Sequence, residues 1–136
     1  MRPLRIILCV QVFIVDDSAL VRERLAELLG EVDNVRVIGE AATAADALTR
    51  IPLVHPDFVL LDVRMPDGDG MAVLAALKRL DHPPLVGMLT HYSLDPYRRR
   101  CVALGADFFW DKSKDLAAIP EALRALAAAA PGSTRD

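Results

Sequence analysis

Residues 58–72 read FVLLDVRMPDGDGMA, and this stretch predicts a strand, a loop and the start of a helix in succession. Its first four residues are apolar, which is typical of a strand covered on both faces of a sheet, and the run ends at the carboxylate of Asp62. After a Pro/Gly loop, a helix is expected to begin at about Asp69. A charged residue that ends a buried strand lies at the carboxyl edge of the sheet, where open α/β sheets keep their binding sites.

The same arrangement occurs earlier in the chain, where the apolar residues 12–15 run directly into Asp16 and Asp17. Packing does not explain three carboxylates at two strand ends, because clustered like charges repel and raise each other's pKa unless a cation joins them. We therefore interpret Asp16, Asp17 and Asp62 as a metal-assisted site in which Asp62 is the reactive group.

The composition limits the class of protein. The chain has 136 residues, which suits a single domain, and its 53% of apolar residues excludes intrinsic disorder. A net charge of −3 gives no electrostatic reason to expect direct nucleic-acid binding. The apolar run at residues 6–15 is too short for a membrane helix and has no signal-peptide cleavage site. With Cys9 and Cys101 interpreted as buried reduced thiols, a cytoplasmic location is expected.

Hydrophobic periodicity predicts strands that alternate with helices along the chain. The alternation favours an α/β doubly wound fold with a five-stranded parallel sheet and right-handed crossovers. Gly30 is expected just after the first helix, and Pro52 and Pro56 are expected to bound a connector. The predicted strands are 11–16, 35–40, 57–62, 85–90 and 106–112, and the predicted helices are 18–29, 41–50 (with Thr43 as a candidate cap), 69–80, 96–104 (with Asp95 as its cap) and 120–130.

One domain is expected over residues 12–130, preceded by an apolar extension at residues 1–11 that runs into the first strand, and followed by a tail at 131–136. The extension has two interpretations. It can simply lengthen the first strand, or it can be an arm that pairs with a second molecule and makes a homodimer, since exposed apolar strands seek partners.

Four of the predicted strands end in polar side chains at one edge of the sheet, namely Asp16/Asp17, Asp62, Thr90 and Lys112. Magnesium prefers hard oxygen ligands, which Asp17 and Asp62 can supply while Asp16 places a water or a neighbouring group. Asp62 is then suited to attack phosphorus and become an aspartyl phosphate. Lys112 would offset charge on the transferring group, and Thr90 would donate a hydrogen bond to a phosphoryl oxygen.

With these motifs in order, the chain resembles the receiver domain of bacterial two-component response regulators. The motifs are VDDS at 15–18, LDVRMPDGDG at 61–70, LT at 89–90 and GAD at 105–107 before Lys112. The resemblance implies a flavodoxin-like sheet of order 2-1-3-4-5 and a transfer of phosphate from a histidine kinase to Asp62. It also implies that Mg²⁺ is bound by Asp16, Asp17, Asp62 and the backbone carbonyl of Arg64.

The resemblance further implies a conformational switch made of Thr90 and Phe109. Phosphorylation would draw Thr90 toward the phosphoryl group and turn Phe109 inward, which would remodel the face of the fourth helix, fifth strand and fifth helix. A downstream protein, or a second copy of the chain, would bind this face. Phe108 and Trp110 are expected to be packing residues.

The chain departs from the family pattern near the site. His91 follows Thr90, where the family usually has a small residue, and its ring could hinder phosphodonor access, contact phosphate or have no role. Arg64 and Tyr92 occupy positions that resemble the family's tuners of phosphate lifetime. Because their bulk could shield the acyl phosphate from water, slow self-dephosphorylation is predicted.

The resulting hypothesis is a stand-alone phospho-acceptor signalling domain that is not an enzyme in its own right and that binds a partner when phosphorylated. The alternative is a magnesium-dependent aspartyl-phosphate hydrolase of haloacid-dehalogenase type, although that family has its two acids two positions apart after the first strand. A flavodoxin-like flavin binder is disfavoured, because no phosphate-cradling Gly/Ser/Thr loop follows the first strand.

Overall fold

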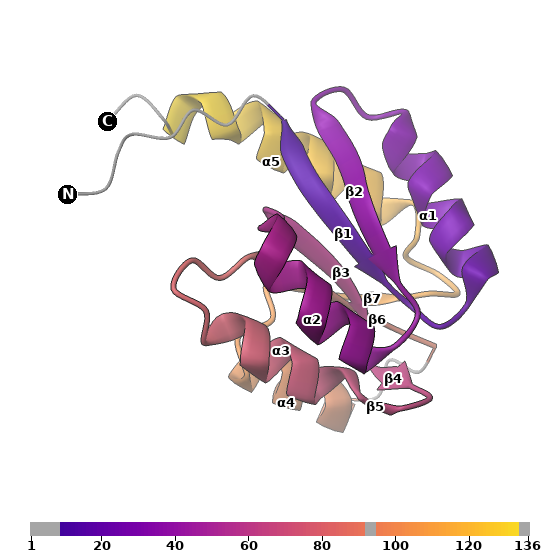
Figure 1. Ribbon diagram of the computed structural model, residues 1–136. Coiled ribbons are helices and arrows are strands. Elements are labelled where there is room, and N and C mark those ends of the chain that lie inside the picture. The colour runs from indigo at the N-terminus through magenta and orange to yellow at the C-terminus, as the bar shows by residue number, and fades with distance from the viewer. Residues whose placement is uncertain (1–8, 92–94, 134–136) are drawn as a thin grey trace.

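A central parallel sheet organises the protein, whose computed structural model describes residues 9–91 and 95–133. The strand order is β2-β1-β3-β6-β7, which is the predicted order 2-1-3-4-5 when the five long strands are counted alone (Figure 1). Two short strands of the β3–α3 loop pair with each other in a separate antiparallel hairpin that the sequence patterns did not indicate. The sheet strands are β1 (Val10–Val15), β2 (Val35–Ala41), β3 (Phe58–Asp62), β6 (Leu85–Thr90) and β7 (Phe108–Asp111), and the hairpin strands are β4 (Arg64–Met65) and β5 (Gly68–Asp69).

Helices cover both faces of the sheet, as expected for a doubly wound fold (Figure 1). On one face lie α1 (Ala19–Gly30) and α5 (Ala118–Ser133), and on the other lie α2 (Ala44–Val54), α3 (Gly70–Lys78) and α4 (Asp95–Ala103). Among the described residues, no helix combines the length and the apolar content needed to span a bilayer.

Each face of the sheet has its own apolar core, because successive residues of a strand point to opposite sides. In β1, Phe13 and Val15 pack with α2, α3 and α4, whereas Val12 and Ile14 pack with α1 and α5. Trp110 belongs to the second core, where it stacks on Phe108 with ring centroids 4.8 Å apart. The two aromatics are therefore packing residues, as predicted.

The end of α2 differs from the prediction. The helix starts at Ala44 rather than Ala41, with Thr43 as its N-cap, and it continues through Pro52 to Val54. Pro52 has no N–H to donate to the carbonyl of Leu48, so this turn lacks one helical hydrogen bond, but the buried Ile51 keeps the turn packed in the core. His55 then ends the helix in the left-handed conformation, with φ of 52°.

Proline positions also misled the prediction of α5. The helix begins two residues before Pro120, because a proline in the first turn lacks only an N–H that has no partner within the helix. Ile119, which precedes the predicted start of this helix, is fully buried in the core. The helix then continues through Pro131 and Gly132 to Ser133, where the prediction ended it before the proline.

The remaining differences are small. Gly30 is the last residue of α1 rather than the residue after it, and Asp95 is the first residue of α4 rather than its cap. Leu104 lies beyond the end of α4 with 38% of its surface exposed, so it does not continue the inward face formed by the buried Cys101. Cys9 is half-buried and Cys101 buried, and both are free thiols. The predicted N-terminal arm lies mostly outside the described residues.

Candidate functional site

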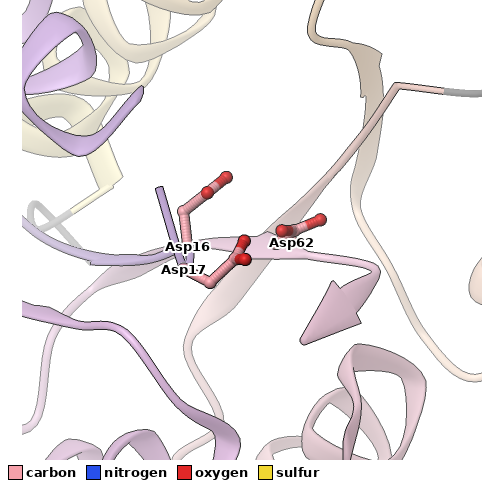
Figure 2. A group of neighbouring side chains, drawn as sticks. All are labelled: Asp16, Asp17 and Asp62. Atoms are coloured by element: carbon pink, nitrogen blue, oxygen red, sulfur yellow. The ribbon is translucent and has the colours of Figure 1, made fainter. Parts of the chain in front are cut away.

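Three carboxylates meet at the carboxyl edge of the sheet, at the ends of β1 and β3. The two strands pair in register, with Val15 opposite Leu61, so Asp16 and Asp17 emerge beside Asp62. One ligand oxygen from each of the three residues lies within 4.8 Å of the others. Figure 2 shows the three side chains as neighbours around the strand ends. The structure thus brings together the acids that the sequence predicted to converge.

Local hydrogen bonds hold the turn after β1. The N–H of Asp16 donates to the carbonyl of Ala41 on β2 over 3.1 Å, and its Oδ1 accepts from the N–H of Ser18 at 2.9 Å. Ser18 in turn caps α1 by accepting from the N–H of Val21 at 3.2 Å. The chain therefore leaves the strand with Asp16 buried and the side chain of Asp17 exposed.

Lys112 contributes the positive charge of the site. It follows β7 directly, and its backbone N–H donates to the carbonyl of Thr90 at 2.7 Å. Its ammonium forms an ion pair with Asp16 Oδ2 and lies 3.1 Å from Asp62 Oδ2. Since the cluster contains three carboxylates and the ammonium pairs with two of them, Asp16 and Asp62, the cluster has an excess of negative charge.

The electrostatics of Asp62 differ from those of an ordinary carboxyl group. Burial is the main cause that raises its pKa, and the neighbouring Asp16 carboxylate adds to the effect. The Lys112 ammonium and the Arg64 N–H, which donates to Asp62 Oδ1 at 3.2 Å, oppose the shift, and the resulting pKa is about 6. Ionisation of Asp62 is therefore less favourable than that of an ordinary carboxyl group, and a nearby cation would favour it.

A divalent cation fits this set of donors. Asp16 Oδ2 is buried and contacts the Lys112 ammonium, yet it has no hydrogen bond of acceptable geometry among the described residues. A buried carboxylate oxygen without a hydrogen bond is a candidate ligand atom, and all three residues of the cluster offer the hard oxygens that magnesium prefers. The fully buried Asp16, the nearly buried Asp62 and the exposed Asp17 suit an ion at the surface of the sheet edge.

The loop after Asp62 is held by backbone contacts. Val63 donates to the carbonyl of Leu89 at 2.9 Å, and Gly70 donates to the carbonyl of Val63 at 2.8 Å. A Cβ atom at Gly70 would lie only 2.0 Å from the backbone oxygen of Asp62, so only glycine allows the start of α3 to approach this closely. The side chain of Arg64 is exposed.

The predicted switch and tuning residues lie around this cluster. Thr90 is buried at the end of β6, one residue past Leu89, which pairs with Asp62. Phe109 on β7 is half-buried against the α2–α3–α4 core, and the guanidinium carbon of Arg98 lies 5.8 Å from the centre of its ring. His91 is exposed. Tyr92 lies outside the described residues.

Two supporting contacts were not apparent from the sequence. Arg22 on α1 donates from Nη1 to the carbonyl of Asp16 at 2.7 Å and pairs through Nε with Glu40 at 3.0 Å. Asp67, at the turn of the β4–β5 hairpin, accepts hydrogen bonds from Ala44 and Ala45. Each contact joins residues that only the tertiary fold brings together, so no local motif could have indicated it.

Comparisons with known proteins agree with this geometry. The family model described as the response regulator receiver domain matches residues 12–124. In Mycobacterium tuberculosis, the DNA-binding transcriptional activator DevR/DosR is 38% identical over 97 residues, which are 71% of this chain and 45% of that protein. A protein-glutamate methylesterase/protein-glutamine glutaminase of Xanthomonas campestris is 40% identical over 107 residues, 77% of this chain and 30% of that protein.

Among solved structures, the signal receiver domain of the putative response regulator NarL from Mycobacterium tuberculosis superposes with a TM-score of 0.80. It is 32% identical in sequence, and the match covers 88% of this chain and 97% of that one. The chain thus spans nearly all of an isolated receiver domain but less than half the length of the two curated relatives.

Proposed function

Because this chain belongs to the response regulator receiver domain family, we propose that Asp62 accepts a phosphoryl group from the phosphohistidine of a histidine kinase. The observation that carries the proposal is the cluster of Asp16, Asp17 and Asp62 at one sheet edge, with the ammonium of Lys112 against it. In this family setting, the excess negative charge favours the binding of a cation, and the cation together with Lys112 would then offset the charge of an incoming phosphoryl group.

The chemistry required of the chain is a single displacement at phosphorus. A carboxylate oxygen of Asp62 attacks the phosphorus of the donor, the P–N bond to imidazole breaks, and the electron pair remains on the ring nitrogen, which takes up a proton. Lys112, 3.1 Å from Asp62 Oδ2, stabilises negative charge on the transferred group. The hydroxyl of Thr90, which is buried at the end of β6, donates a hydrogen bond to a phosphoryl oxygen.

Asp16, Asp17, Asp62 and the backbone carbonyl of Arg64 are the residues that would hold Mg²⁺. When bound, the ion would offset charge between the carboxylates and the incoming phosphoryl group. The backbone N–H of Asp16 donates to the carbonyl of Ala41, and its carboxylate accepts from the N–H of Ser18. These two hydrogen bonds orient the carboxylate before any ligand binds.

The output proposed for the phosphorylated state is contact with another protein. Thr90 and Phe109 form the switch, and the surface that changes consists of α4, β7 and α5, where a downstream protein or a second copy of the chain would bind. The two curated relatives, a DNA-binding activator and a methylesterase, share the receiver region but not the output, so the class of partner differs within the family. That the domain catalyses no reaction on another molecule remains a proposal, as does the division into residues 1–11, 12–130 and 131–136.

Arg64 and Tyr92 are the proposed tuners of phosphate lifetime, with His91 as a third residue at the rim of the site. Replacing both Arg64 and Tyr92 by alanine is expected to accelerate loss of the phosphoryl group, because water then reaches the acyl phosphate more easily. The decay of the phosphorylated protein, followed by intact mass after removal of the donor, measures this. Equal decay rates for the variant and the wild type would remove the two residues from this role.

The direct test of the proposed function is incubation with acetyl phosphate in the presence and absence of Mg²⁺. The expected result is a gain of one phosphoryl group that needs the ion and is absent in Asp62→Asn, while Asp81→Asn, which changes an exposed loop carboxylate, behaves as the wild type. Repeated turnover of phosphate monoesters would instead support the hydrolase alternative. No mass gain by the wild type would contradict the proposal.

A further inference from the structure

Asp67 forms a contact between two parts of the protein that no function yet explains. It lies in the turn between β4 and β5, and its carboxylate reaches the first turn of α2, which Figure 1 shows beside this hairpin. Oδ1 accepts from the N–H of Ala44 at 2.8 Å, and Oδ2 accepts from the N–H of Ala45 at 3.0 Å. Each oxygen thus has its own backbone donor.

These hydrogen bonds complete the N-terminus of α2 from outside the helix. The first N–H groups of a helix have no acceptor within it, and a negative charge near them is favourable. Thr43, the residue just before the helix, accepts a hydrogen bond from the N–H of Asp46 at 3.1 Å and is therefore the local N-cap. The N–H groups of Ala44 and Ala45 have no partner in this cap, and Asp67 accepts from both of them. The two backbone hydrogen bonds hold the pKa of the Asp67 carboxyl below its usual range, in agreement with an ionised cap.

The hairpin that Asp67 anchors is the loop of the functional site. It begins two residues after Asp62, includes the Arg64 N–H that donates to Asp62 Oδ1, and ends at Asp69, the N-cap of α3. The hairpin also lies against α2 at Gly68, where a Cβ atom would be 3.5 Å from that of Ala44. Contacts at both Asp67 and Gly68 thus join the hairpin to a helix on another part of the chain.

We infer that Asp67 is a positioning residue for the metal site: by joining the β4–β5 hairpin to the N-terminus of α2, it keeps the Arg64 backbone in place beside Asp62. This inference rests on the proposed function, in which the Arg64 carbonyl is a ligand of Mg²⁺. Asp67 itself contacts neither the ion nor the phosphoryl group. Its removal should weaken the site without removing any ligand.

The matched control is Thr43→Ala. Both Thr43→Ala and Asp67→Ala delete a cap of the same helix and are expected to lower the melting temperature, but only Asp67→Ala releases the hairpin. Asp67→Asn keeps one acceptor oxygen and should therefore retain one of the two hydrogen bonds. Mg²⁺ dissociation constants from isothermal titration calorimetry, phosphorylation rates with acetyl phosphate and melting temperatures are measured for the wild type and all three variants.

Asp67→Ala is expected to weaken Mg²⁺ binding by about tenfold, as is usual when a residue that supports metal ligands is lost, and to slow phosphorylation at subsaturating Mg²⁺. Thr43→Ala should keep wild-type affinity, and Asp67→Asn should fall between the two. If the wild type binds Mg²⁺ and is phosphorylated but Asp67→Ala has the affinity of Thr43→Ala, the inference is wrong and the proposed function stands. A wild type that neither binds Mg²⁺ nor is phosphorylated overturns both.

Discussion

Asp62 is more easily protonated in the folded protein than in the unfolded chain, because its pKa rises from 3.8 to about 6 on burial beside Asp16. The folded state therefore binds more protons than the unfolded state between these two values, and the free energy of unfolding falls as the pH rises through that interval. The contribution is fully present below pH 3.8 and is lost as the pH rises through about 6. Ionisation of Asp62 thus lowers the free energy of unfolding at neutral pH, and a cation bound beside it would offset this effect.

Asp62→Asn should accordingly stabilise the metal-free protein at pH 7. The upper limit of the gain is about 3 kcal/mol, the equivalent of the pKa displacement, and the gain should shrink toward zero near pH 4. Urea denaturation of both proteins in the presence of a chelator, from pH 4 to 8, measures it.

Addition of Mg²⁺ serves as the control for that measurement. The ion should stabilise the wild type more than Asp62→Asn, and for the wild type its affinity should decline as the pH falls below about 6, where Asp62 takes up a proton. A difference in stability between the two proteins that is independent of pH would contradict the assignment of the raised pKa to Asp62.

Gly70 is the second residue with a sharp prediction. Because a Cβ atom there would lie 2.0 Å from the Asp62 backbone oxygen, Gly70→Ala must displace the start of α3 or the end of β3. We expect a loss of about 1–3 kcal/mol in the free energy of unfolding, together with slower phosphorylation of Asp62.

Gly30→Ala is the matched control for this substitution. It places the same methyl group in the last turn of α1, where no atom lies within 4 Å, and alanine is the better helix former. Chemical denaturation should therefore show equal or greater stability for Gly30→Ala. Two variants of equal stability would show that the backbone near Asp62 moves freely, against the close packing described above.

Much of the site was predictable at this scale, because Asp16, Asp62 and Lys112 each stand directly at the end of an apolar strand. A parallel sheet brings all such ends to one edge, and the structure confirms that these side chains meet there. The contacts of Arg22 with the Asp16 carbonyl and of Asp67 with α2 were not predictable, since the partners are backbone groups. The path of a loop determines which backbone carbonyl or N–H lies within reach of a side chain. That path cannot be predicted from the residue types of a short segment.

At the scale of elements, strands were predicted more reliably than helix ends. Strands β2, β3 and β6 match to within one residue because each apolar run is bounded by polar or turn residues. The ends of α2 and α5 were wrong, since proline was given more weight than the apolar faces that packing extends across it. The β4–β5 hairpin was missed, because strands of two residues leave no periodic pattern.

The switch prediction belongs to β7 and α4. Phe109 is half-buried, with the Arg98 guanidinium over its ring, an arrangement worth about 0.5–1 kcal/mol at an exposed site. Because this is small, the proposed inward turn of the ring on phosphorylation would cost little through the loss of this contact. Amide chemical shifts of α4 and β7 are expected to change on phosphorylation of the wild type, and far less in Phe109→Ala, although that variant still accepts the phosphoryl group.

Thr90→Ala should likewise accept the phosphoryl group but show much smaller shift changes in α4 and β7. The reason is that the Thr90 hydroxyl is the proposed link between the phosphoryl group and the Phe109 ring. Leu85→Ala, which changes an exposed residue at the opposite end of β6, is the control and should respond as the wild type does. Undiminished shift changes in both Thr90→Ala and Phe109→Ala would contradict the switch.

At the scale of the whole molecule, the fold allows a charged cluster to exist beside two apolar cores. The cores on the two faces of the sheet hold β1 and β3 in register, and this register keeps the carboxylates at the two strand ends near one another despite their repulsion. The same scaffold in the two curated relatives accompanies different outputs. The family could therefore be inferred from this sequence, whereas the partner could not, since partner choice depends on surface residues that the sheet does not constrain.

The most direct test of the account is the position of the transferred phosphoryl group. The protein is phosphorylated with acetyl phosphate and Mg²⁺, the acyl phosphate is reduced with borohydride to homoserine, and the modified residue is located by peptide sequencing. The account predicts modification at position 62 alone. Modification at Asp16 or Asp17 instead, or a phosphoryl group carried by a serine, threonine or histidine, would contradict it.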